Sequence, residues 1–341
     1  MRIFLLGALL GCLFVSCRSV PEREAIFPAP EENGPPENVF PETAEVLPVS
    51  PFREIWGYVV AGRENALNVN MPVTDVGYFG AELDSYGRLG GVPSRRLLAA
   101  FRGKVHLVVA SNSRSLTHFA LESGSRTRNR LVADLLEASR NFDGLQIDFE
   151  YVPSRDGEHF RSFLGELRRG LGGKILSIAL PARTRAIEND VYDYAKILPL
   201  VDRILVMAYD EHWSGSRPGP IASLEWCKNI ARYSLSTVGA EKLIMGIPFY
   251  GRTWGSVNPN RAFFYSGIER IKTENQITEI ERVNGIPSFS YETSLVITAW
   301  YEDSYSLSDK LETYRDMGIK AVGFWSIGQE TPDVWRLLTV E

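Results

Sequence analysis

The segment FDGLQIDFEYVP, residues 142–153, carries the residues whose types and spacing best suit catalysis. In an extended strand side chains alternate between two faces, so Gln146, Asp148 and Glu150 share one face and the apolar residues between them the other. Burying two carboxylates side by side disfavours ionisation through desolvation and like charge. A carboxyl group with a raised pKa suits general acid–base catalysis, with Glu150 as the acid. A structural hydrogen-bond network is the alternative that the spacing leaves open.

Short apolar runs alternate with amphipathic stretches after about residue 52, and they indicate the elements that must position these groups. Apolar residues recur at helical spacing in RLVADLLEASR, EHFRSFLGELRRGL and LSDKLETYRDMG. Strands are expected at residues 55–60, 76–79, 105–110, 145–150, 175–180, 204–209, 243–248 and 321–325.

This alternation predicts an α/β fold, a (β/α)8 TIM barrel over residues 52–341, with a doubly wound parallel sheet as the alternative. The first crossover, GRENALNVNMPVT, makes a poor helix. The interval from about Thr253 to Ser306 is long enough to hold a small insertion between strands 7 and 8. TIM barrels place catalytic groups at the C-terminal ends of their strands, which is where Glu150 falls.

The pattern D-G-x-x-x-D-x-E at residues 143–150 resembles the signature of family 18 glycoside hydrolases, the chitinase-like enzymes. RILVMAYDEHW resembles that family's sixth strand, IMGIPFYGRTW its seventh and AVGFWSIG its eighth, while TAWYEDSYSLSDK resembles the segment before its last helix. In order, these motifs cover nearly all of residues 53–341. IDFEYVP and YDEHWSGSRPGPIASL resemble most closely the branch of N-acetylglucosaminidases that act on spore cortex and peptidoglycan.

The resemblance implies a substrate-assisted retaining mechanism, in which the 2-acetamido group of the bound sugar attacks its own anomeric carbon. Glu150 would be the general acid and base, Asp148 would accept a hydrogen bond from the acetamide N–H, and Tyr209 would donate to the acetamide oxygen. Trp325 would stack beneath the sugar. The other implied substrate-binding residues are Gln146, Met207, Asp210 and Tyr58. Core packing of the aromatic residues and Met207, and a loop-bracing role for Asp210, are the alternatives.

Gln146 stands where the family usually has Asp, although the cortex-lytic branch often has an amide there. Because its NH₂ group can donate, we expect Gln146 to hydrogen-bond to Asp148 and to hold that carboxylate ionised. Four more aromatic residues are candidates for sugar contacts and equally for the core: Trp213, Tyr250, Trp254 and Trp300.

Charge and composition argue against several other classes of protein. The net charge is −5 with no basic stripe, which disfavours nucleic acid as a partner. The three cysteines have neither a disulfide framework nor metal-ligand spacing, and Cys227 reads as a core residue. His159 and His212 have no ligand-like partners. We therefore expect no metal and no cofactor, and a monomer.

The first residues, MRIFLLGALLGCLFVSC, read as a secretion signal because the apolar run is too short to span a bilayer. LFVSC resembles a bacterial lipoprotein signal, so residues 1–17 are expected to be a signal peptide with lipidation at Cys17, although Phe14 replaces the usual Leu. Lipidation at Cys12 and a plain signal peptide are the alternatives. Residues 18–51, dense in Pro and Glu, are expected to be a disordered tether.

We thus expect an exported protein that is lipid-anchored to a bacterial membrane, at the outer membrane or cell surface rather than the inner membrane. Its predicted activity is cleavage of β-1,4 linkages next to N-acetylglucosamine, in peptidoglycan or chitin-type oligosaccharides. A non-catalytic carbohydrate-binding lipoprotein is the alternative. Such proteins typically lose the acid at the position of Glu150, which is present here with Asp148 and Tyr209. A glycosidase for N-glycans is a third reading.

Overall fold

Eight parallel strands close into a barrel in which each strand pairs with two barrel neighbours. The structure, a computed structural model, describes residues 46–255, 261–292 and 296–341. In spatial order the strands are β2 (Glu54–Val60), β15 (Ala321–Trp325), β9 (Leu243–Pro248), β8 (Arg203–Met207), β7 (Ile175–Pro181), β6 (Gly144–Phe149), β5 (Lys104–Ser111) and β3 (Asp75–Leu83). Pairing of β2 with β3 closes the ring, so the predicted (β/α)8 barrel is confirmed and the doubly wound sheet is excluded.

The barrel strands are largely apolar on both faces, as expected for parallel strands that are covered on both sides, and β6 is an exception because Gln146 and Asp148 occupy its inward face. Each lies at a place where the sequence predicts one. Several predicted C-terminal ends are wrong by one to four residues, because β3 continues to Leu83 while β6 stops at Phe149 and β8 at Met207. Glu150 and Tyr209 therefore lie in the loops that follow their strands, and Asp210 comes directly after Tyr209. Asp210 has a φ of 59°, a left-handed conformation incompatible with a strand.

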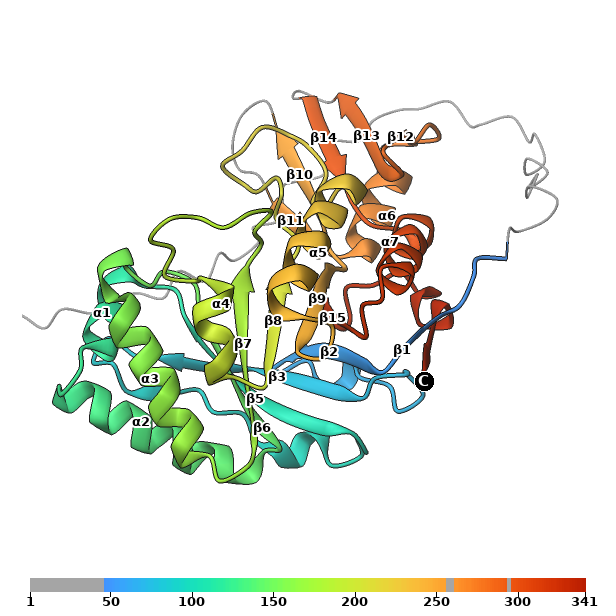
Figure 1. The fold of residues 1–341 in the computed structure, drawn as a ribbon. Helices are drawn as coiled ribbons and strands as arrows, with labels where there is room; N and C mark the ends of the chain where they lie inside the picture. Colours follow the sequence, from blue (N-terminus) through green and yellow to red (C-terminus); the bar gives the residue numbers. More distant parts are fainter. Residues whose placement is uncertain (1–45, 256–260, 293–295) are drawn as a thin grey trace, which may run out of the picture. The chain divides into compact units, whose positions relative to one another are not determined.

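Helices follow most barrel strands and cover the outside of the ring (Figure 1). α3 is typical, since Phe160, Phe163, Leu164 and Leu167 lie at helical spacing on its buried face. The first crossover contains only a 3₁₀ turn at Glu64–Ala66, as its sequence indicates. The helices are α1 (Arg114–Leu121), α2 (Arg126–Ala138), α3 (Gly157–Gly170), α4 (Tyr194–Ile197), α5 (Leu224–Val238) and α7 (Ser304–Asp316). A short strand, β4 (Leu89–Gly90), pairs with the end of β3.

An insertion between β9 and β15 forms its own antiparallel sheet, which confirms the predicted insertion between the seventh and eighth barrel strands. Its elements are β10 (Gly251–Gly255), β11 (Arg261–Phe263), α6 (Tyr265–Glu274), β12 (Glu281–Val283), β13 (Ile286–Glu292) and β14 (Val296–Trp300). Figure 1 shows these strands grouped together, apart from α1, α2 and α3. A small core that includes Ile268, Phe289 and Tyr301 holds the insertion together.

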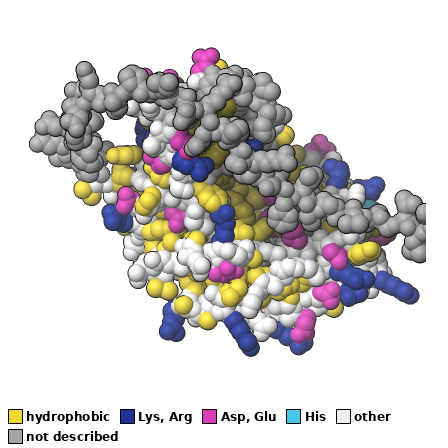
Figure 2. Space-filling view, turned by 180° about the vertical axis from the view of Figure 1, so that it is seen from behind, with side chains coloured by type: hydrophobic (Ala, Val, Ile, Leu, Met, Phe, Trp, Pro, Cys, Tyr) yellow, Lys and Arg dark blue, Asp and Glu magenta, His cyan; other side chains and the backbone are white. Residues whose placement is uncertain are grey.

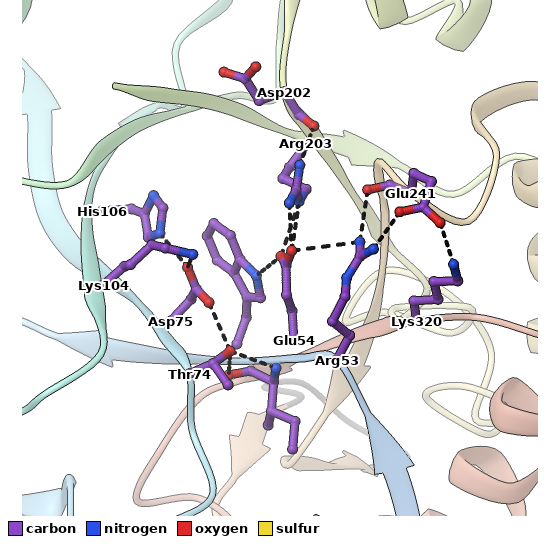
Figure 3. Close-up of polar contacts among 12 residues, drawn as sticks. Arg53, Glu54, Thr74, Asp75, Lys104, His106, Asp202, Arg203, Glu241 and Lys320 are labelled. Atoms are coloured by element: carbon purple, nitrogen blue, oxygen red, sulfur yellow. Dashed lines mark hydrogen bonds and ion pairs between the residues drawn. The ribbon is translucent and has the colours of Figure 1, made fainter. Parts of the chain in front are cut away.

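An ionic network closes the N-terminal end of the barrel (Figure 3). Glu54 at the start of β2 accepts hydrogen bonds from Arg203 Nε at 3.0 Å and from Trp56 Nε1 at 3.2 Å. Asp75 at the start of β3 bonds to His106 Nε2 at 2.9 Å. Glu241 pairs with both Arg53 and Lys320. These residues come from six segments of the chain, and they lie at the end of the barrel opposite Glu150.

The folded unit begins before residue 52, which corrects the C-terminal boundary of the predicted tether. Strand β1 (Ser50–Phe52) pairs in parallel with β16 (Leu338–Val340) and Phe52 is fully buried. Pro51 is compatible with this pairing because the strand lies at an edge. Cys12, Cys17 and most of the predicted tether lie outside the described residues.

The surface carries charges of both signs. On the face that Figure 2 shows, Lys and Arg side chains are interspersed with Asp and Glu. Within the described ranges no helix combines the length and the apolar character needed to cross a membrane.

Candidate active site

Strand β6 sets the direction of its side chains as the sequence predicts. The ring of Phe149 stacks on Phe160 and Phe163 of α3, with centroids 6.4 and 5.8 Å apart, so the apolar face of β6 packs against a helix. Gln146 and Asp148 point to the other side, into the barrel interior, where both are buried.

Glu150 follows β6 directly and is held by backbone contacts on either side. Tyr192 Oη donates to Phe149 O at 2.8 Å and accepts from Val152 N at 2.9 Å. Glu150 N donates to Ser111 O at 3.3 Å, which joins the ends of β6 and β5. The Glu150 residue is exposed to solvent, as a proton donor to a bound substrate requires.

A cavity of about 320 Å³ lies at the C-terminal end of the barrel beside Glu150. Its size lies at the lower end of the range of small-molecule sites. Five predicted site residues besides Glu150 share its wall: Asp148, Met207, Tyr209, Asp210 and Trp325. A second cavity shares Glu150, Met207, Tyr209 and Asp210 with the first and extends toward Tyr151, Pro181 and Trp226. The two cavities form one cleft with space on both sides of Glu150, and we call it the catalytic cleft.

Asp148 is the least satisfied carboxylate of the cleft. It is 9% exposed, and its Oδ1 atom has no hydrogen-bond partner among the described residues. Burial, and then the charge of Glu150, raise the pKa of Asp148 to about 7. A buried acceptor without a donor is costly, and a ligand N–H at this position would satisfy it.

Glu150 also has a raised pKa, caused first by burial of the carboxyl group and then by the charge of Asp210. A raised pKa keeps the carboxyl group protonated to higher pH, which suits a general acid. The electrostatic conditions that the sequence suggested for these two carboxyl groups are therefore present.

Asp210 binds two residues of the strand-7 motif and lines the cleft at the same time. Tyr250 Oη donates to Asp210 Oδ1 at 2.6 Å, and Arg252 Nη2 lies 3.0 Å from the same oxygen. Asp210 is thus braced in its loop, as the alternative interpretation held, and also contributes to the cleft wall. Burial, followed by neighbouring charges, raises the pKa of Tyr209 well above its usual value, so this phenol remains a neutral donor.

Trp325 forms part of the cleft wall and contacts two other aromatic rings. The ring of Phe79 meets it edge-on with the ring centroids 5.0 Å apart, and the ring of Tyr58 is tilted against it with the centroids 5.6 Å apart. Trp325 is partly exposed, which leaves some of its surface available to a sugar.

Gln146 and Tyr58 are buried and hydrogen-bonded to each other, and their contact with substrate stays a prediction. Neither lines the cleft. Tyr58 Oη donates to Gln146 Oε1 at 2.5 Å, and Gln146 Nε2 donates to Ser177 Oγ at 3.1 Å. The predicted donation from Gln146 to Asp148 is wrong, because the amide is turned toward the neighbouring strand β7.

Several cleft residues are absent from the predicted site. Tyr250 and Arg252 lie in the motif IPFYGRTW and could have been selected from it. Phe263 and Phe264 come from the insertion, where no motif marks them. In the first cavity the residues not predicted from the sequence are Phe79, Asn112, Arg252, Ala262, Phe263, Phe264 and Gln329, and in the second they are Phe149, Tyr151, Ala179, Pro181, Ala182 and Trp226.

The other aromatic candidates divide between core and surface. Trp254 is buried, and its Nε1 donates to Trp213 O at 3.3 Å. Trp213 itself is 55% exposed. Trp300 packs beside Trp254 and Tyr250 in a small apolar cluster next to the cleft. Within the described part of the chain, no group of three or more His, Cys, Asp and Glu side chains could hold a metal ion.

Comparison with known proteins finds sequence relatives that include a glycosylase and a cortical fragment-lytic enzyme. The chain is 31% identical over 243 residues to the glycosylase YdhD of Bacillus subtilis, covering 66% of this chain and 57% of that protein. It is 26% identical over 226 residues to a cortical fragment-lytic enzyme of Bacillus anthracis, covering 62% and 53% respectively. The match therefore spans little more than half the length of these two relatives.

Solved structures show the same fold. The spore cortex-lytic enzyme SleL of Bacillus cereus superposes with a TM-score of 0.77 at 23% identity, over 86% of this chain and 76% of that one. A family 18 chitinase from Cycas revoluta in complex with (GlcNAc)3 gives 0.67 at 20% identity, over 83% and 97%. Residues 100–330 match glycosyl hydrolases family 18, which is more than half of the sequence. The chain therefore belongs to family 18 of the glycosyl hydrolases.

Proposed function

We propose that the protein hydrolyses β-1,4 linkages next to N-acetylglucosamine, in peptidoglycan or chitin-type glycans, by a substrate-assisted retaining mechanism. The observation that carries this proposal is the pair of carboxyl groups at the end of β6. Asp148 Oδ1 is buried without a partner in the described part of the chain, and Glu150 lies two residues further on in the wall of the cleft. An acetamide N–H is a donor of the kind that Asp148 lacks.

The first step is departure of the leaving group. Glu150 gives its proton to the glycosidic oxygen while the acetamido oxygen of the same sugar attacks the anomeric carbon. The bond to the leaving sugar breaks and an oxazolinium-like intermediate forms. Asp148 accepts the hydrogen bond from the acetamide nitrogen, which becomes more acidic as positive charge develops on the ring.

The second step consumes water. Glu150, now ionised, takes a proton from a water molecule that attacks the anomeric carbon and reopens the ring. Two displacements return the anomeric centre to its original configuration. Tyr209 donates to the acetamido group, and Trp325 presents a flat apolar surface to the sugar ring.

Space on both sides of Glu150 supports cleavage rather than simple binding, because a glycan must extend past the acid in both directions to be cut. The substrate class is supported by the relatives, whose names include cortical fragment-lytic enzymes and chitinases. A protein that only bound glycans would gain nothing from a raised pKa at Glu150.

Replacement of Glu150 by Gln tests the activity. The variant keeps the shape of the side chain but has no proton to give, so kcat should fall by about 10²- to 10⁴-fold on N-acetylglucosamine oligomers while binding persists. Glu137→Gln, an exposed change on α2, is the matched control and should leave kcat unaltered. Matching glucose oligomers should not be cleaved by the wild type, since they lack the acetamido nucleophile. Unchanged turnover in Glu150→Gln, or equal cleavage of both oligomers, would contradict the proposal.

We also propose that Cys17 carries a lipid that anchors the exported protein to the membrane. The support is the sequence MRIFLLGALLGCLFVSC, with its short apolar run ending at the cysteine. Radiolabelled palmitate supplied to expressing cells should appear on the protein. The label should vanish, and the protein should become soluble, on Cys17→Ala. Loss of label with Cys12→Ala instead would move the anchor to that residue.

A further inference from the structure

We infer that a third cavity, beside the catalytic cleft, is a subsite for a carboxylate-bearing substituent of the glycan. We call it the arginine cavity, after Arg114 and Arg155 in its wall. The inference rests on the proposed glycosidase function and narrows its substrate class. The subsite would select a glycan that carries lactyl or peptide carboxylates over a neutral chitin chain.

The arginine cavity is built from two segments that also contribute to the cleft. Arg114 begins α1, two residues after Asn112, which lines the cleft. Pro153 and Arg155 follow Glu150 on the way from β6 to α3. The hydrogen bond from Glu150 N to Ser111 O holds the two segments side by side.

Chain geometry limits the distance between the two sites. Consecutive Cα atoms are about 3.8 Å apart, so the Cα atom of Arg114 lies within about 8 Å of that of Asn112. The Cα atom of Pro153 lies within about 11 Å of that of Glu150 by the same reasoning. The two walls are therefore neighbours at this end of the barrel, and the inference requires a substituent that spans the gap between them.

The charge of the cavity wall is positive. The residues that line it include two arginines and no Asp or Glu. Arg114 is exposed and makes no hydrogen bond or ion pair within the described residues. Arg155 is 72% exposed, with its Nε 4.0 Å from Asp156 Oδ1. Asp156 is itself buried and bonded to His118 Nδ1 at 2.9 Å. The two guanidinium groups are thus available to a ligand.

The positive charge of Arg114 and Arg155 offsets the negative charge of the acidic residues in the catalytic cleft. Among the described residues that line the cleft, Asp148, Glu150 and Asp210 outnumber the one cation, Arg252, so an anionic glycan is disfavoured there when these carboxyl groups are ionised. Guanidinium groups bind carboxylates through paired N–H donors, and they bind them better than a lysine would. The arginine cavity therefore supplies the attraction that an acid-bearing glycan needs beside an acidic cleft.

Apolar groups in the same wall indicate what accompanies the carboxylate. Phe119 is 60% exposed, and Pro153 of the second segment lines the same cavity. At about 470 Å³, the cavity has room for more than a carboxylate. A short peptide attached to the sugar through a lactyl group combines carboxylates with aliphatic side chains and matches both features. Chitin has neither.

The test compares the double variant Arg114→Gln/Arg155→Gln with the wild type. The substrates are peptide-bearing peptidoglycan fragments and N-acetylglucosamine oligomers with the same number of sugars. The measured quantity is the ratio of kcat/KM for the first to that for the second. Two exposed ion pairs are lost, so this ratio should fall by about three- to thirtyfold. Arg140→Gln, an exposed arginine before the N-terminal end of β6, is the matched control and should leave the ratio unaltered.

A binding measurement separates the subsite from the chemistry. In a Glu150→Gln background, calorimetry should show tighter binding of the peptide-bearing fragment than of the neutral oligomer, and the two arginine substitutions should abolish the difference. Raising the salt concentration should weaken only the arginine-dependent part.

An unchanged ratio in the double variant, together with unchanged binding, would overturn the subsite while leaving the glycosidase proposal intact. Absence of any cleavage by the wild type would overturn the proposed function, and the calorimetry would still decide the subsite. Fragments from which an amidase has removed the peptide separate the two sources of carboxylate. A preference that survives this treatment assigns the lactyl carboxylate to the arginines, and one that is lost assigns the peptide.

Discussion

The charge of Asp210 acts on Glu150 although the two residues follow different strands. The negative charge of Asp210 adds to the effect of burial in raising the pKa of Glu150. Asp210 is in turn fixed by Tyr250 and Arg252, so its position beside the acid is set by residues of the strand-7 motif. The proton on Glu150 is thus stabilised by the charge of a neighbouring carboxylate in the cleft wall.

Replacing Asp210 by Asn should lower the pKa of Glu150, because it removes a neighbouring negative charge. The general acid would then lose its proton at lower pH, and the alkaline limb of kcat/KM should move to lower pH. Asp134→Asn, on the exposed face of α2, is the control and should not move the limb. Carbon NMR titration of the Glu150 carboxyl group in the two variants checks the assignment. A limb that stays in place for Asp210→Asn would show that burial alone sets this pKa.

Ionisation of Asp148 lowers the stability of the folded protein. Its pKa of about 7 in the folded protein is above that of an unfolded aspartate, so its ionisation reduces stability as the pH rises. A ligand that donates an N–H to Oδ1 stabilises the ionised form and offsets this cost. In the free protein the ionised form of Asp148 is therefore destabilised, and a bound substrate that donates to Oδ1 would stabilise it.

Strand β1, near the first described residues, pairs with strand β16, near the last. Ser50, Pro51 and Phe52 pair in register with Leu338, Thr339 and Val340. Phe52 is fully buried in the main core, whereas its partner Val340 is 43% exposed. The two strands of this small ladder therefore contribute unequally to stability.

Phe52→Ala should reduce the free energy of unfolding by about 3–5 kcal/mol, because it removes a buried ring and leaves a cavity. Val340→Ala changes the exposed partner residue on β16 and should cost less than about 1 kcal/mol. Urea unfolding followed by tryptophan fluorescence measures both. Equal small losses would mean that residues 50–52 rest on the surface as the end of a tether.

The insertion is the other element with a functional consequence. Strand β10 carries Arg252 to Asp210, and β11 brings Phe263 to the rim of the cleft. Because the insertion has a core of its own, its walls can be positioned without changes to the barrel strands.

The two ends of the barrel differ in the arrangement of their charged residues. The C-terminal end of the barrel carries the carboxyl groups with raised pKa values, while the N-terminal end is closed by paired charges (Figure 3). Burial by itself would raise the pKa of Glu54, but hydrogen bonds from Arg203 and Trp56 outweigh it and leave that pKa below its usual value. The ion pair between Glu54 and Arg203 joins β2 to β8 across the barrel.

Glu54→Gln should destabilise the protein at pH 7 by about 1–3 kcal/mol, because Arg203 loses a charged acceptor. A carboxyl group with a lowered folded pKa stabilises the fold above its unfolded pKa of about 4.3, and this contribution is lost as the pH falls through the folded value. The difference between wild type and variant should therefore shrink at pH 3. Urea unfolding at both pH values measures it. A difference that is equally large at pH 3 would mean that shape, not charge, accounts for the loss.

The barrel, its eight strand positions and the insertion could be predicted from the sequence, because each depends on local alternation and on runs of apolar residues. The same alternation gave the inward direction of Gln146 and Asp148. Motifs brought Glu150, Tyr209, Asp210 and Trp325 to one site, and the structure places all four on the cleft wall.

Other features depended on contacts between segments that are far apart in the sequence, and only the tertiary structure decided them. Gln146 could turn its amide to Asp148 or to Ser177, and the choice depended on where β7 and Tyr58 lie. Phe263 reaches the cleft because the insertion folds back over it. Arg114 and Arg155 share a cavity because the ends of β5 and β6 are neighbours. Periodicity fixes which way a side chain points along its own strand, but its neighbours are fixed only when the barrel closes.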